Sequence, residues 1–173
     1  MSGPVVWFTG LPSSGKTTLA RAVKERLDSR HVPCCVLDSD DVREALSPRP
    51  GYDPEARDAF YETLGSLAVL LARQGLVTLV AATAHQRKYR EQARAAAPRF
   101  IEVHVNTPLE TCQRRDAKGL YRRAGSGEIS DVPGAHLNYE PPRAPEVVAE
   151  GGLSDKAVEA VVSAIFSKSP LPS

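Results

Sequence analysis

Apolar residues occur along this chain in two alternating spacings, one typical of strands and one typical of helices. Short, continuous apolar runs recur between longer stretches in which apolar side chains return every three or four positions. The expected strands are residues 5–8, 33–37, 76–81 and 100–105, and the expected helices are residues 16–29, 55–73, 87–96 and 154–166. This alternation predicts an α/β fold in which a parallel central sheet carries helices on both faces.

One stretch in the second half of the chain lacks either pattern. Residues 119–134 are rich in glycine and serine, and we expect them to form a mobile loop. Together with its flanking cations this loop would make a lid over about residues 115–137. The rest of the chain shows no internal repeat or linker, so we expect one domain over residues 1–167 and a frayed tail at residues 168–173.

The segment between the first expected strand and the first helix carries a phosphate-binding pattern. Its eight positions match Gly-x-x-x-x-Gly-Lys-Ser/Thr, the Walker A sequence. In such a loop the backbone N–H groups surround an oligophosphate at the positive end of a helix, the lysine reaches the β- and γ-phosphates, and the threonine hydroxyl binds Mg²⁺. A nucleoside triphosphate is therefore expected here, held by Gly10, Leu11, Pro12, Ser13, Ser14, Gly15, Lys16, Thr17 and Thr18.

Two carboxylates follow the second expected strand. Because the carboxyl ends of parallel strands share one edge of the sheet, Asp38 and Asp40 are expected close to the phosphate loop. We expect Asp38 to hold a water on Mg²⁺ and Asp40 to face an acceptor hydroxyl, which favours a transferase over an NTPase that positions water. A simpler interpretation stays open, in which these aspartates cap a helical turn at residues 42–46.

The balance of charges gives no reason to expect a nucleic acid or membrane partner. The chain has 22 Lys and Arg against 21 Asp and Glu, a formal net charge of +1. A basic cluster in the helix at residues 87–96 has few interleaved aromatic residues, unlike a nucleic-acid stripe. We interpret its cations as a solvated helix face: Arg87, Lys88, Arg90 and Arg94.

Targeting and redox signals are also missing from the sequence. No secretory pattern opens the chain and no apolar run approaches the roughly 18 residues that span a bilayer, so we expect a cytoplasmic protein. Cys34, Cys35 and Cys112 have no metal-binding spacing, and we expect all three to be small core residues.

Several segments in order along the chain resemble the adenylylsulfate kinase family, from about residue 5 to residue 150. The phosphate loop is shared by many nucleotide-binding families. The segment at residues 115–121, which follows the expected strand at residues 100–105, is typical of far fewer families. The segments that carry the resemblance are Gly10–Thr17, Leu37–Arg43, Ser47–Arg57, Phe100–Cys112, Arg115–Tyr121 and Tyr139–Pro142.

The resemblance implies a three-layer P-loop kinase-like fold and a specific reaction. ATP, with Mg²⁺, would give its γ-phosphoryl group to the 3′-hydroxyl of adenosine 5′-phosphosulfate, a step of sulfate activation. Such a transfer needs positioning and neutralisation of spread negative charge more than covalent chemistry. The family tends to form dimers, and the apolar content of the expected helix at residues 55–73 is compatible with a homodimer without requiring one.

The resemblance also assigns roles to individual residues. Lys16 and lid cations, Arg115 among them, would hold ATP, while Thr17 and Asp38 would hold the metal and Asp40 would act as general base. On the acceptor side the resemblance implies contacts to the phosphosulfate from Arg43 and Arg57, stacking on the adenine by Tyr52, and contacts to the nucleotide end from Lys118 and Leu120.

The sequence departs from the family pattern around the expected acceptor site. Phe60-Tyr61-Glu62-Thr63 stands where the family usually has Asn-Ile-Arg-Arg, and Ala82-Thr83-Ala84-His85-Gln86-Arg87 where it often has Phe-Ile-Ser-Pro-Tyr-Arg. Val132 takes the place of a second stacking aromatic residue. One lost stacking face costs about 1–3 kcal/mol of base binding, unless Phe60 or Tyr61 compensates.

Two alternatives to the adenylylsulfate acceptor therefore stay open. The first is a related P-loop kinase that phosphorylates another small-molecule hydroxyl, such as that of a nucleoside, a sugar or a natural-product intermediate. The second is a nucleotide-gated binding module with no acceptor, in which Asp40 would be structural.

Overall fold

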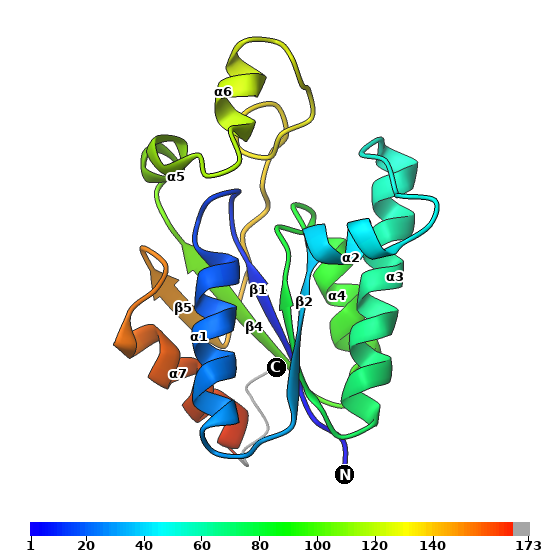
Figure 1. Cartoon of the computed structure of the whole chain (residues 1–173), viewed down its shortest axis with the longest axis vertical. Coiled ribbons are helices and arrows are strands. Elements are labelled where there is room, and N and C mark those ends of the chain that lie inside the picture. Colours follow the sequence, from blue (N-terminus) through cyan, green and yellow to red (C-terminus); the bar gives the residue numbers. More distant parts are fainter. Residues whose placement is uncertain (168–173) are drawn as a thin grey trace.

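The computed structural model describes residues 1–167 and contains a five-stranded parallel sheet. The frayed tail expected at residues 168–173 lies outside the described residues. The strands lie in the order β2-β3-β1-β4-β5, so the chain crosses over between neighbouring strands (Figure 1). Their bounds are Val5–Thr9 for β1, Cys34–Asp38 for β2, Val77–Ala81 for β3, Phe100–Asn106 for β4 and Val147–Glu150 for β5.

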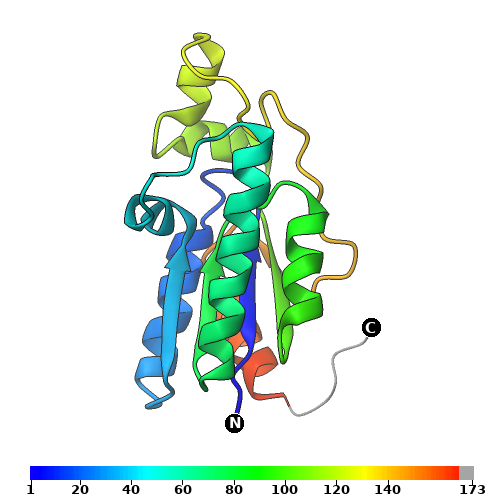
Figure 2. The ribbon, with the colours of Figure 1, turned by 90° about the vertical axis from the view of Figure 1, so that its right-hand side faces the viewer.

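Helices cover both faces of this sheet, as the hydrophobic pattern predicts, and the three-layer α/β fold is confirmed. One face carries α1 and α7, and the other carries α3 and α4 (Figures 1 and 2). Three short helices, α2, α5 and α6, lie at the carboxyl edge of the sheet. The helix bounds are Lys16–Asp28 for α1, Ser39–Ala45 for α2, Pro54–Arg73 for α3, Arg87–Ala96 for α4, Leu109–Arg115 for α5, Leu120–Gly125 for α6 and Asp155–Phe166 for α7.

The central strand β1 sets the position of the phosphate loop. All five of its residues are buried, because β3 and β4 pair with it on either side and helices cover both of its faces. Its side chains alternate between the two cores, with Val6 and Phe8 facing α1 and α7, and Val5 and Trp7 facing α3 and α4. The loop that follows β1 is therefore anchored in the most enclosed part of the molecule.

Two elements of the second half were missed by the sequence analysis. Residues 119–134 contain the helix α6. The carboxylate of Asp116 accepts hydrogen bonds from the backbone N–H groups of Tyr121 and Arg122 in the first turn of this helix, each at 3.0 Å. The segment is thus not wholly a loop. The fifth strand, β5, is only four residues long and alternates buried and exposed positions at the sheet edge, so it leaves no continuous apolar run.

The cysteines and the basic helix also differ from expectation. Cys112 is fully buried, but Cys34 and Cys35 lie on the edge strand β2 and are only half-buried. In α4, Arg90 is buried and Arg94 half-buried, so the expectation of a solvated basic face is wrong for these two residues. No helix within residues 1–167 is long and apolar enough to cross a membrane.

Arg90 and Arg94 belong to an ionic network that fastens the segment before β5 to the sheet. Arg90 donates to Glu102 Oε1 at 3.0 Å and to the carbonyl oxygen of Glu140. Arg94 makes two hydrogen bonds to Glu146, at 2.6 and 3.0 Å, and Glu146 also accepts the Glu102 N–H at 2.6 Å. The network joins α4, β4 and the segment that returns from α6 to the sheet.

We expect Glu146→Ala to lower the free energy of unfolding by about 2–4 kcal/mol, because Arg94 and the N–H of the buried Glu102 lose their common acceptor. Denaturant titration measures this change. Lys24→Ala is the matched control, since it removes an exposed ion pair with Asp28 within α1 and should leave the transition midpoint almost unchanged. Equal midpoints for wild type and Glu146→Ala would contradict the assignment of this network to stability.

Candidate active site

The phosphate loop has the backbone geometry that its glycines predict. Gly15 has a φ of 102°, in the left-handed region, and immediately precedes α1. Gly10 has no room for a side chain, because a Cβ there would lie 2.6 Å from the Val105 carbonyl oxygen and 2.7 Å from Ser14 Oγ. Gly10 therefore lets the loop pass close to β4 and to the Ser14 side chain, and Gly15 leads it into the start of a helix, where an anion is stabilised by N–H groups.

The side chain of Lys16 lies back along this loop. Its ammonium donates to the carbonyl oxygens of Gly10 at 3.2 Å and Leu11 at 2.8 Å. Desolvation, assisted by the nearby Lys118 ammonium, lowers the pKa of Lys16 to about 8. An anionic phosphate would favour the charged form, so this lysine is suited to an oligophosphate ligand.

A hydroxyl and a carboxylate meet where β1 and β2 end. Thr17 Oγ1 donates to Asp38 Oδ2, and Asp38 is almost fully buried. Oxygen ligands of these two kinds fit Mg²⁺, which keeps several waters and takes the rest of its ligands from substrate phosphates. The described residues contain no group of three or more His, Cys, Asp or Glu side chains that could hold a metal ion alone. Thr17 and Asp38 thus fit a shared site with a nucleotide.

Asp38 also caps α2, as the alternative interpretation of the sequence holds, and it uses one of its two carboxylate oxygens to do so. Its Oδ1 accepts the N–H of Asp40 at 2.9 Å, and α2 begins at Ser39, three residues before the turn expected at residues 42–46. Capping and metal binding are compatible here, because the other oxygen faces Thr17.

The lid reaches Asp40 through an ion pair. Lys118, from the segment between α5 and α6, binds Asp40 Oδ2, and both side chains are largely exposed. The structure therefore brings together two predicted site residues that lie 78 positions apart in sequence. Lys118 is also close enough to Lys16 to help lower the pKa of that lysine, so the ion pair connects Asp40 to the surroundings of the phosphate loop.

The predicted acceptor side is built around Arg43. This residue is buried and lies between two aromatic rings, with its guanidinium carbon 4.4 Å from the ring centre of Tyr52 and 3.8 Å from that of Phe60. Its Nη1 donates to the Gly51 carbonyl at 3.1 Å. Tyr52 remains half exposed, so one ring face is covered by the arginine while much of the ring stays accessible.

Arg57 connects this side to the lid. Its Nη2 donates to the carbonyl oxygen of Asp131 at 2.7 Å, and its guanidinium lies 5.8 Å from the Tyr52 ring centre. The neighbouring Val132 is buried in a small cluster with Cys112 and Tyr121, against which Leu120 packs. Leu120 is thus a packing residue of the lid in this structure.

Arg115 joins the phosphate loop to the loop after β5. It donates to the Ser14 carbonyl at 3.4 Å and to the Gly151 carbonyl at 3.1 Å. A Cβ on Gly152 would lie 2.8 Å from the Ser14 carbonyl oxygen, so the two loops touch. The sequence analysis missed Gly151 and Gly152, although a glycine pair directly after a strand could have indicated a close backbone approach.

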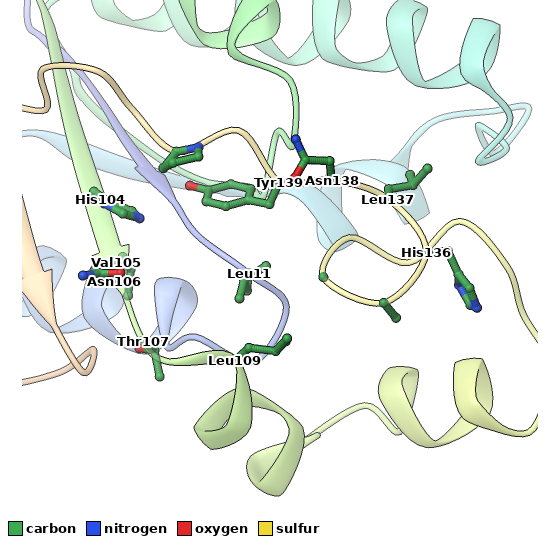
Figure 3. A pocket seen from close by; sticks show the side chains of 13 residues that line it. Leu11, His104, Val105, Asn106, Thr107, Leu109, His136, Leu137, Asn138 and Tyr139 are labelled. Carbon is green, nitrogen blue, oxygen red and sulfur yellow. The ribbon is translucent and has the colours of Figure 1, made fainter.

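A cavity of about 570 Å³ lies beside the phosphate loop but away from these charged groups. Leu11 and Leu109 form apolar walls, and His104 and Tyr139 lie above them in the view of Figure 3. Of the predicted site residues, only Leu11 lines it. The side chain of Leu11 therefore packs in this cavity, and its contribution to a phosphate site comes from the backbone.

The fold and the site together define a P-loop phosphotransferase, with a phosphate loop, a metal-compatible Thr–Asp pair and a carboxylate beside a basic lid. The adenylylsulphate kinase family model matches residues 2–150. The chain belongs to the adenylylsulfate kinase family, as its motifs predict.

Individual relatives agree with this assignment. An adenylyl-sulfate kinase of Chloroflexus aurantiacus is 47% identical over 146 residues, which cover 84% of this chain and 78% of the relative. One from Synechococcus sp. (strain JA-3-3Ab) is 44% identical over 156 residues, covering 88% and 89%. The solved Mycobacterium tuberculosis APS kinase CysC in complex with AMPPNP and APS superimposes with a TM-score of 0.90 at 35% identity, covering 96% of this chain and 99% of that one.

We expect Arg115→Ala to raise the KM for ATP about tenfold, because the hydrogen bonds of a charged donor to the Ser14 and Gly151 carbonyls are lost. Initial-rate kinetics with varied ATP measures the effect. Arg114→Ala is the control, since this neighbour in α5 bonds only Thr111 among the described residues. Similar KM values for both variants would show that Arg115 has no special part in nucleotide binding.

Proposed function

We propose that this chain transfers the γ-phosphoryl group of ATP to the 3′-hydroxyl of adenosine 5′-phosphosulfate. The single observation that carries the proposal is the position of Asp40. Its backbone N–H donates to Asp38, which also accepts the Thr17 hydroxyl, and its carboxylate pairs with the lid lysine Lys118. A base in that position serves an alcohol acceptor that lies between the phosphate loop and the lid.

In the proposed step Asp40 accepts the proton of the acceptor hydroxyl, and the oxygen of that hydroxyl forms a bond to the γ-phosphorus. The bond from this phosphorus to the β,γ-bridging oxygen breaks, and ADP leaves. Lys16 neutralises charge on the transferred group. Thr17 and Asp38 would hold Mg²⁺, which would add further charge neutralisation. Lys118 must exchange its bond to Asp40 for one to substrate, which couples the position of the lid to the release of this carboxylate for the acceptor hydroxyl.

The acceptor would lie against Tyr52, with Arg43 and Arg57 facing its anionic groups. Arginine suits this role because its planar donors pair with phosphate and sulfate oxygens. Phe60 and Tyr61 are both buried, so neither offers an open ring face that could replace the aromatic residue missing at Val132. On this proposal the adenine stacks on one side only, and a homodimer remains compatible with the sequence without being required by it.

The substrate assignment is tested by supplying purified protein with ATP and Mg²⁺ and one acceptor at a time. Adenosine 5′-phosphosulfate should give ADP and the 3′-phosphorylated product in equal amounts. Nucleosides, sugars and water alone should give only background ADP. Turnover of another hydroxyl compound without turnover of adenosine 5′-phosphosulfate would overturn the assignment in favour of a related kinase.

We expect Asp40→Ala to lower kcat about 10²-fold or more, because the acceptor proton loses its base. Steady-state assays with both substrates at saturation measure the loss, and equilibrium titration should show that ATP still binds. Asp41→Ala, at the neighbouring exposed position in α2, is the control and should keep nearly full activity. Unchanged turnover in Asp40→Ala would show that this residue is structural and is not the base.

A further inference from the structure

Phe60 stands at a position where the chain departs from the family pattern, and its ring lies directly against the predicted acceptor site. The guanidinium carbon of Arg43 is 3.8 Å from the centre of this ring, closer than to any other ring that it contacts within the described residues. Phe60 is 2% exposed and Arg43 is 4% exposed. The contact is therefore desolvated, the condition under which a cation–π interaction is strongest.

The surroundings of Arg43 leave its side chain few alternative positions. Tyr52 lies 4.4 Å from the guanidinium carbon, and the Gly51 carbonyl accepts from Nη1 at 3.1 Å. The charged groups and titratable rings near it are Arg57, Tyr61 and Tyr52, and burial lowers the pKa of Arg43. A guanidinium carries five N–H donors, so the bond to Gly51 leaves donors for an anion.

No carboxylate is bonded to Arg43 among the described residues, and the cation nearest to it in this set of neighbours is Arg57. Two arginines of like charge beside one half-exposed tyrosine repel each other unless an anion lies between them. Aromatic rings hold a guanidinium without neutralising it, whereas a carboxylate would compete with the substrate. Phe60 thus fixes the direction of Arg43 and preserves its charge for a ligand.

We propose that Phe60 is a positioning residue for the acceptor, because its ring fixes the Arg43 guanidinium in the orientation that binds the anionic phosphosulfate. This inference rests on the proposed function and adds to it a residue that the resemblance does not supply. The Phe60 ring is buried and has no polar group, so it acts on a ligand only through the arginine.

The test compares Phe60→Leu and Phe60→Met with wild type. Both variants keep an apolar side chain and remove the ring face. The KM for adenosine 5′-phosphosulfate should rise about 3- to 30-fold, the range that one cation–π contact supports. The KM for ATP should stay within about twofold, since the phosphate loop is untouched, and kcat should change little because Asp40 keeps its place.

A double-mutant cycle separates positioning from a general loss of core packing. In an Arg43→Met background, Phe60→Leu should raise the KM for the acceptor no further, because the partner through which it acts is gone. Phe100→Leu is the matched control. This ring is buried and lies 4.8 Å from the Arg94 guanidinium, in the network away from the acceptor, so Phe100→Leu should lower Tm without changing either KM.

The outcomes distinguish the inference from the proposed function. A wild-type protein that does not turn over adenosine 5′-phosphosulfate overturns both. A wild-type protein that does, with an acceptor KM unchanged in a folded Phe60→Leu or Phe60→Met variant, overturns the inference alone. An equal rise in the KM with and without Arg43 also overturns it, because Phe60 would then act on the site by another route.

Discussion

The carboxylate of Asp38 is the interaction on which the arrangement of the site depends. One oxygen accepts the Thr17 hydroxyl from the start of α1, and the other accepts the Asp40 N–H at the start of α2. A single buried side chain therefore joins the helix that follows β1 to the helix that follows β2. Because both strands are parallel and end at the same edge, this bridge holds the start of α2 close to the start of α1, and α2 carries Asp40 and Arg43 on one of its faces.

The lid is held to this edge by hydrogen bonds from several directions and has little core of its own. Tyr121 donates to the Pro12 carbonyl at 2.9 Å, Arg57 to Asp131, and Lys118 to Asp40. Its cluster of buried residues is small compared with the two cores of the sheet. Such a segment is suited to opening and closing, since polar contacts at its margin can exchange for contacts to substrate.

The return segment from the lid is fixed much more firmly. Glu140 and Glu146 tie it to α4 and β4 through Arg90 and Arg94, and Tyr139 shares a hydrogen bond of 2.9 Å with Thr9 at the end of β1. This anchored segment, which begins at Tyr139, directly follows the predicted lid along the chain. We therefore expect any motion of the predicted lid to be confined to about residues 115–137, with the sheet edge that presents the phosphate loop remaining in place.

The sequence by itself determined the local features of this protein. The phosphate loop, the cap at Asp38, and the major strands and helices follow from spacing and from backbone requirements that act over a few residues. It missed β5 and α6, which are short and carry weak periodic signals. Only the tertiary structure decided that Arg90 and Arg94 are fastened in an ionic network, that Arg43 lies between two rings, and that Lys118 meets Asp40. These contacts join residues brought together by the packing of separate elements, and no pattern along the chain encodes such a distance.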